Sequence, residues 1–178
     1  STYLYGIFHE FGFTEWDNVA DLLTAMSGKY IISDTHKLLK DREFLLLSER
    51  RIDVSRNEVF TIQKEQQTTE LPLKMKFCIV DRRDNNTDDI IYVAENALKY
   101  PLVIRKWNKG DYFYPLGFHG KKKLSKFFKD EKIDVLSKQK QWLLCSGNEI
   151  VWVIGSRADD RFKVKENTKE VLRIEVIL

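Results

Sequence analysis

The sequence predicts an α+β fold built mostly from antiparallel β-sheet, with only a few short helices. Two observations lead to this fold class. Short apolar segments rich in β-branched and aromatic residues recur along the chain, and most of them are joined by short polar or glycine-containing loops. Helical spacing of apolar residues, by contrast, is confined to a few short segments. No internal repeat with a period of about 20 to 50 residues is visible.

The first 58 residues predict a small helix-plus-hairpin unit. Thr14 and Asp17 resemble a capping box, and Gly28 stands where a helix would end, which predicts a helix of about three turns. Its apolar positions, spaced by three and four residues, are Trp16, Val19, Ala20, Leu23 and Met26. A hairpin packed on this helix is expected from strands at Tyr30–Ile32, Thr35–Leu39 and Phe44–Leu47, with a turn at Lys40–Arg42.

Ser48–Ser55 is charged and linker-like, so we place a domain boundary between units 1–58 and 59–178. Residues 59–178 predict further strands at Val59–Ile62, Leu73–Val80, Ile90–Val93, Leu102–Ile104, Trp142–Cys145, Ile150–Ile154 and Glu170–Ile177. A helical turn is expected at Ala94–Leu98. A short helix is expected at Leu124–Lys132, with Leu124, Phe127, Phe128 and Ile133 facing inward.

Several classes of protein are disfavoured by what the sequence lacks. It has no apolar run of about 18 residues and no signal-peptide layout, which favours a cytoplasmic protein with no membrane contact. Cys78 and Cys145 stand alone in apolar runs and are expected to be buried thiols. His9, His36 and His119 have no catalytic neighbours, so no catalytic or metal-binding residue is predicted. The first residue is Ser1 rather than methionine, and we expect an excised fragment.

The positive charge is concentrated in the second part of the chain. Residues 1–100 carry 13 Lys and Arg against 17 Asp and Glu, whereas residues 101–178 carry 17 against 10. Within the second part, the basic segment 105–140 holds 11 bases against 4 acids. Such a concentration indicates a polyanionic partner.

Two glycine-bearing loops and the short helix at Leu124 organise this basic segment. Lys121, Lys122 and Lys123 come just before the helix, where free N–H groups also favour phosphate. Because lysine is a point charge without fork geometry, the pattern suits backbone phosphates of A-form RNA better than base edges. The alternative is an ordinary solvated surface. Trp107, Trp142 and Trp152 are expected in the core, although Trp107 could offer a face to a terminal base.

Two blocks of residues resemble a known family. The first comprises Gly110-Asp111, Phe113, Pro115, Gly117, Gly120, Lys122–Ser125, Phe127-Phe128 and Lys132-Ile133, and the second comprises Ile150–Gly155, Arg157 and Arg161–Val164. They resemble the C-terminal domain of bacterial tRNA(Ile)-lysidine synthases, and Gly28-Lys29, Thr35–Arg42 and Leu45–Ser48 resemble the stretch before it. Two positions depart from the family pattern: Asp134 stands where many members have proline, and Lys126 where an acidic residue is common.

The resemblance implies a ligase that uses ATP and Mg to attach lysine to the wobble cytidine of an isoleucine tRNA. The family's ATP-binding Ser-Gly-Gly-x-Asp-Ser loop is absent from this sequence, so chemistry and cofactors would belong to an N-terminal ATPase domain of the parent enzyme. The resemblance further implies that residues 1–58 are a substrate-binding subdomain. Residues 59–178 would be a tRNA-binding β-sandwich, of a type shared with the phenylalanyl-tRNA synthetase β chain, that grips the acceptor stem.

Nine basic residues are the candidates for RNA contact. Carried over by position, the first rank is Arg105, Lys122, Lys123, Arg157 and Arg161, and the second rank is Lys106, Lys109, Lys121 and Lys126. Structural alternatives remain open: Arg105 could pair with Asp111, and Arg157 or Arg161 could pair with Asp159, Asp160 or Glu166. The rival function is a protein-interaction or homodimerisation module with an incidental basic surface.

Overall fold

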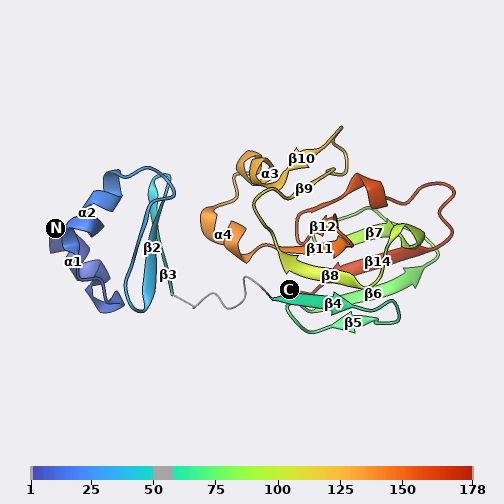
Figure 1. Cartoon of the computed structure of the whole chain (residues 1–178), viewed down its shortest axis with the longest axis horizontal. Helices are drawn as coiled ribbons and strands as arrows, with labels where there is room; N and C mark the ends of the chain where they lie inside the picture. The colour runs from blue at the N-terminus through green and yellow to red at the C-terminus, as the bar shows by residue number, and fades with distance from the viewer. Residues whose placement is uncertain (1, 50–57, 178) are drawn as a thin grey trace. The chain divides into compact units, whose positions relative to one another are not determined.

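The computed structural model describes residues 2–49 and 58–177, which form two compact units that we call the N-terminal and C-terminal units. Figure 1 shows helices beside a small sheet in the first, and stacked sheets with two helices in the second. The predicted linker at 48–55 lies mostly outside the described residues. Ser48 and Glu49 belong to a strand. None of the helices in the described ranges is long and apolar enough to cross a membrane.

The N-terminal unit is the predicted helix-plus-hairpin unit. Its helical elements are α1 (Thr2–Phe8), the 3-10 turn η1 (His9–Phe11) and α2 (Trp16–Thr24). Its strands are β1 (Tyr30–Ile32), β2 (His36–Asp41) and β3 (Phe44–Glu49), antiparallel in the order β1-β2-β3. Phe8, Phe13, Val19, Leu22 and Leu38 form the buried core between helices and sheet.

The helix prediction in this unit was wrong in its limits. The N-cap position of α2 is Glu15 rather than Thr14, without a capping bond from its side chain, and the helix ends at Thr24 because Ala25 has an extended backbone. Leu23 and Met26, which were predicted on the apolar side of the helix, are therefore 46% and 81% exposed, and Leu22 is buried instead. Helix α1 was not predicted.

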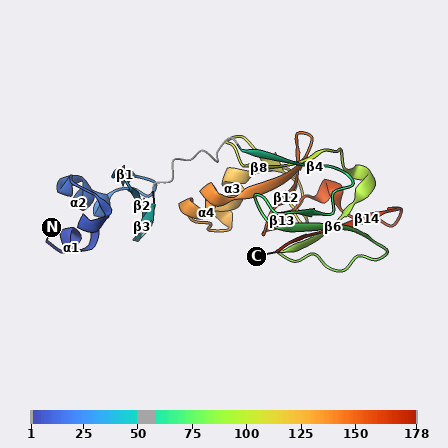
Figure 2. The same ribbon diagram turned by 90° about the horizontal axis from the view of Figure 1, so that it is seen from below.

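The C-terminal unit contains two larger antiparallel sheets (Figure 2). The five-stranded sheet has the order β13-β12-β11-β8-β4, with β4 (Val59–Ile62), β8 (Leu102–Lys106), β11 (Trp142–Ser146), β12 (Glu149–Val153) and β13 (Arg157–Ala158). The four-stranded sheet has the order β5-β6-β14-β7, with β5 (Thr68–Thr69), β6 (Met75–Val80), β7 (Ile90–Ala94) and β14 (Val171–Val176). All strand pairs in residues 58–177 that these sheets contain are antiparallel, as predicted.

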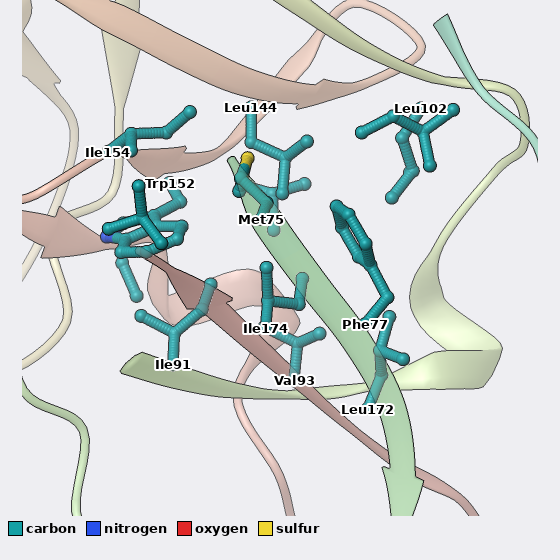
Figure 3. Close-up of a cluster of buried hydrophobic side chains, with 14 of the residues drawn as sticks. Met75, Phe77, Ile91, Val93, Leu102, Leu144, Trp152, Ile154, Leu172 and Ile174 are labelled. Atoms are coloured by element: carbon teal, nitrogen blue, oxygen red, sulfur yellow. The ribbon is translucent and has the colours of Figure 1, made fainter. Parts of the chain in front are cut away.

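The two sheets share one hydrophobic core. Leu144 and Trp152 contribute to it from the five-stranded sheet, and Met75, Phe77 and Ile174 from the other (Figure 3). Because side chains alternate along a strand, Met75 and Phe77 point inward and Cys78 points out. The expectation of a buried Cys78 was therefore wrong: its side chain is exposed, whereas Cys145 is buried.

A second cluster covers the other face of the five-stranded sheet. Helix α3 (Leu124–Asp130) buries Leu124, Phe127 and Phe128 there, as predicted. Strand β11 sends Leu143 and Cys145 toward this cluster and Leu144 toward the main core, which explains its continuous apolar run. The short elements that follow or flank α3 were not predicted: α4 (Val135–Lys140), β9 (Tyr112–Phe113), β10 (Lys122–Lys123), β13 and the 3-10 turn η4 (Asp160–Phe162). The 3-10 turn η3 (Glu95–Ala97) matches the predicted helical turn.

Helix α4 is held at both ends by side chains. At its start the Asp134 carboxylate accepts from the Ser137 backbone N–H at 2.9 Å. At its end the Trp107 indole N–H donates to the Lys138 carbonyl at 2.6 Å, and Lys106 Nζ donates to the Lys140 carbonyl at 2.7 Å. Asp134 has a φ of −70°, a value that a proline at this position would also have.

Candidate RNA-binding surface

The basic segment folds around a two-stranded sheet. Strands β9 and β10 pair antiparallel, with Lys122 opposite Phe113 and Lys123 opposite Tyr112. Helix α3 starts immediately afterwards, and the Leu124 N–H donates to the Asp111 carbonyl at 2.9 Å. The turn before β9, the β9–β10 hairpin and α3 are thus one connected region (Figure 1).

Pairing divides the three consecutive lysines between two sides. Phe113 is fully buried, and its partner Lys122 keeps only 15% of its side chain exposed. Tyr112 and Lys123 lie on the opposite, exposed side. Lys121 is exposed as well, and its Nζ lies 3.5 Å from the centroid of the Tyr112 ring.

Lys122 is neutralised by an acid. Its Nζ lies 2.9 Å from an Asp130 carboxylate oxygen. The hydrogen bond from Lys122 lowers the pKa of Asp130, and the charges of Lys126 and Lys129 lower it further. Lys122 is therefore tied to α3 rather than offered to solvent.

Arg105 is also paired, in the way the structural alternative expected. Its two terminal nitrogens donate to the two Asp111 oxygens at 2.8 and 3.0 Å, and this bond raises the pKa of the guanidinium. Asp111 accepts in addition from the Asn108 backbone N–H at 2.7 Å. The bidentate pair fixes the turn that leads into β9.

Arg161 belongs to a denser network around Asp159, whose side chain has no exposed surface. The Arg161 guanidinium donates to both Asp159 oxygens at 3.0 and 2.9 Å and reaches Glu149 at 2.6 Å. The bond to Asp159 raises the pKa of Arg161. Asp159 also accepts from the Tyr114 N–H at 2.9 Å, which attaches the end of β9 to η4.

The remaining candidates differ in how far they are engaged. Lys106 lies over the Trp142 ring at 3.9 Å besides bonding to the end of α4. Arg157 is exposed, and it donates to the Leu116 carbonyl at 3.3 Å. Within the described residues, Arg157 forms no ion pair with Asp159, Asp160 or Glu166, whereas Arg161 pairs with Asp159.

We group five of the exposed lysines of this region as the lysine surface: Lys109, Lys121, Lys123, Lys126 and Lys129. Within residues 2–49 and 58–177, none of them has an acidic group within ion-pair distance. Lys126 and Lys129 lie three residues apart on α3, so they are neighbours on its surface, and Lys123 is the N-cap residue three positions before Lys126. Lys129 was missed by the sequence reasoning, although this spacing could have revealed it.

The region has the chemistry of an anion-binding surface, because exposed ammonium groups without an ion pair can bind phosphates. In the described part of the chain, no group of three or more His, Cys, Asp or Glu could hold a metal ion.

Comparison with known families agrees with the two-unit organisation. The model of the "TilS substrate binding domain" matches residues 1–50, and that of the "TilS substrate C-terminal domain" matches residues 102–176. The chain carries these two domains of the tRNA(Ile)-lysidine synthase family. It is 37% identical over 182 residues to the tRNA(Ile)-lysidine synthase of Parabacteroides distasonis, covering 99% of this chain and 41% of that protein.

Further relatives give the same result. The chain is 32% identical over 184 residues to the tRNA(Ile)-lysidine synthase of Bacteroides thetaiotaomicron, covering 98% of this chain and 39% of that protein. It thus spans about 40% of the length of these relatives. Its fold resembles the crystal structure of a TilS C-terminal domain, with a TM-score of 0.55 at 19% identity, covering 68% of this chain and 99% of that one.

Proposed function

We propose that this chain is the tRNA-gripping part of a cytoplasmic tRNA(Ile)-lysidine synthase. The parent enzyme would use ATP and Mg in an N-terminal ATPase domain to attach lysine to the wobble cytidine of tRNA(Ile), and this part would do no chemistry. The relatives' shared name and the two matching domains support the proposal. In the same proposal, residues 1–58 are the substrate-binding subdomain. Residues 59–178 are the tRNA-binding domain, with the sandwich type of the phenylalanyl-tRNA synthetase β chain.

The lysine surface is the proposed contact with RNA. The observation that carries the proposal is five exposed lysines without an ion pair among the described residues. Its lysines would follow the phosphates of the tRNA acceptor stem, which supplies affinity without reading sequence. A second contact far from the anticodon would help a rigid tRNA place its anticodon loop in the distant active site. Arg105, Lys122 and Arg161 become positioning residues that hold the hairpin, while Arg157 and Lys106 flank the surface.

The test is a pair of double variants with matched charge loss. Lys121→Ala with Lys123→Ala removes two charges of the lysine surface. The control, Lys74→Ala with Lys76→Ala, removes two exposed lysines at the same spacing in the four-stranded sheet. Lys74 lies just before β6, and Lys76 belongs to it. We expect the first pair to weaken tRNA binding by about 1–3 kcal/mol at low salt, and the second to change it little.

The salt dependence of tRNA affinity shows whether the lost contacts are contacts with phosphates. Two lost phosphate contacts reduce the slope of log K against log salt by about 1.4–1.8. The loss of affinity in the first pair should therefore shrink by up to about tenfold between 50 and 200 mM salt. Equal affinity for tRNA in the wild type and this pair across that range contradicts the proposal.

The rival function also has an observation in its favour. In the N-terminal unit, Tyr30 and Ile32 on β1 and Phe44 on β3 are 56%, 52% and 69% exposed. Apolar side chains exposed on one small sheet are typical of an interaction surface. Mass measured by size-exclusion chromatography with light scattering separates the two: a dimer with no tRNA complex favours the rival.

A further inference from the structure

The loop between β9 and β10 presents an aromatic side chain to solvent. Phe118 is 51% exposed. Its N–H donates to the Pro115 carbonyl at 2.9 Å, so it sits in a tight turn. Gly117 and Gly120, with φ of 81° and 102°, flank it, and the space where their side chains would be is open. A planar ligand could approach the ring at this point without displacing the loop.

Two cations contact this loop. Lys122 Nζ lies 5.1 Å from the centroid of the Phe118 ring, held there by Asp130. The exposed Arg157 side chain donates to the carbonyl of Leu116, two residues before Phe118. Phe118 is thus an exposed apolar ring with one cation near its face and a second cation bonded to the same loop.

A second exposed ring lies on the outward side of the hairpin. Tyr112 is 41% exposed, with Lys121 Nζ at 3.5 Å from its centroid. Its edge contacts Tyr114 at 6.3 Å between centroids, and Arg161 lies 4.6 Å from the Tyr114 ring. Two adjacent tyrosine rings therefore lie between two cations, in the order Arg161, Tyr114, Tyr112, Lys121. Because Asp159 fixes Arg161, the row is held rigidly from one end.

We propose that Phe118 and Tyr112 stack on unpaired nucleobases, so that the surface takes a single-stranded RNA end next to a duplex. The inference rests on the proposed RNA binding and specifies which part of the RNA is bound. Lysines alone would follow duplex phosphates, whose bases are already stacked on one another. Proteins hold single-stranded nucleic acid with exposed rings on a positively charged surface, since every base has a π-face that can stack on a ring.

Two RNAs that differ only at one end provide the test. The first is a blunt hairpin duplex, and the second is the same hairpin with four unpaired nucleotides at its 3′ end, one of them 2-aminopurine. Wild-type chain should bind the second at least about 5-fold more tightly, the lower limit for one stacked base, and should quench the 2-aminopurine fluorescence. Phe118→Leu with Tyr112→Leu should lose this preference and the quenching, while binding of the blunt hairpin stays unchanged.

Controls separate this inference from the proposal on which it rests. Phe44→Leu with Tyr30→Leu removes two exposed rings from the N-terminal unit and should keep the preference. Lys121→Ala with Lys123→Ala should weaken binding of both RNAs. Equal wild-type affinity for the two RNAs, or equal weakening of both by the Phe118 and Tyr112 substitutions, overturns stacking and leaves phosphate binding standing. A wild-type chain that binds neither RNA overturns both.

Discussion

Arg161 provides the sharpest test of whether a basic residue in this domain is structural. Its guanidinium and two backbone N–H groups, those of Tyr114 and Arg161, are the donors to the buried Asp159 carboxylate among the described residues. Arg161→Ala removes the countercharge and leaves the carboxylate where water cannot reach it. The expected result is loss of stability rather than of a direct RNA contact.

The size of the loss follows from the exposure of each partner. Breaking a buried ion pair by removing one member costs about 3–5 kcal/mol. Arg161 keeps 28% of its side chain exposed, and two backbone donors to Asp159 remain, so we expect a smaller loss of about 2–4 kcal/mol. The contact with Glu149, which is 46% exposed, accounts for at most about 1 kcal/mol of this loss.

Urea unfolding followed by tryptophan fluorescence measures this loss in the full chain. In a Trp16→Phe background the three remaining tryptophans of the sequence, Trp107, Trp142 and Trp152, all lie in the C-terminal unit, so the signal reports that unit alone. A loss of about 2–4 kcal/mol lowers the midpoint by about 1–2 M urea. Arg157→Ala is the matched control: its side chain is exposed, so we expect a change below about 0.5 kcal/mol.

A midpoint for Arg161→Ala equal to that of the wild type would refute the reasoning. If tRNA binding were weaker at the same time, Arg161 would be a direct contact.

Three further predictions concern other parts of the chain. A thiol reagent at pH 8 should modify the exposed Cys78 quickly and Cys145 only on unfolding, because Cys145 is buried and its burial raises the pKa of its thiol to about 11. Two fast-reacting thiols, or a fast reaction that remains in Cys78→Ser, would contradict this. Burial and the Glu95 carboxylate raise the pKa of Tyr100 from 10.0 to about 12. Tyr100 therefore ionises more readily in the unfolded chain, and the free energy of unfolding should fall as the pH rises from 10 to 12. Tyr100→Phe should make this fall smaller, whereas the control Tyr3→Phe, at a side chain that is 90% exposed, should not. Asp134→Ala should lower the free energy of unfolding by about 1 kcal/mol near pH 7. Since the hydrogen bond from Ser137 lowers the pKa of Asp134, the difference should disappear as acid protonates the carboxylate.

Much of the fold could be predicted because its strands carry their own signal. The β11–β12 hairpin shows two apolar runs around Gly147-Asn148, and α3 shows inward residues at helical spacing. Strands of two residues, such as β9 and β10, are too short to show an alternation of apolar and polar residues in the sequence. They are recognised only by the hydrogen bonds that pair one strand with the other. Helix α1 was missed because its apolar residues occupy most positions and Tyr3 and Ile7 stay exposed, so no stripe stands out.

The candidate site could be predicted as a segment but not residue by residue. Consecutive lysines look equivalent in sequence, and only the pairing of Lys122 with Phe113 decides that Lys122 faces inward and Lys123 outward. Arg105 and Asp111 are close in sequence, so their pairing could be considered in advance. The contact between Glu149 and Arg161 joins positions 12 residues apart and depends on how β12 and η4 fold together.

The pairing of β9 with β10 also determines which sequence changes this region can accept. The loop from Tyr114 to Lys121 could change length without altering which residues of β9 and β10 face outward. One residue inserted between Asp111 and Phe113 would instead exchange the two sides of β9, turning a tyrosine into the core and a phenylalanine to solvent. During evolution, this domain should therefore tolerate the gain or loss of lysines more readily than the insertion or deletion of a single residue in β9.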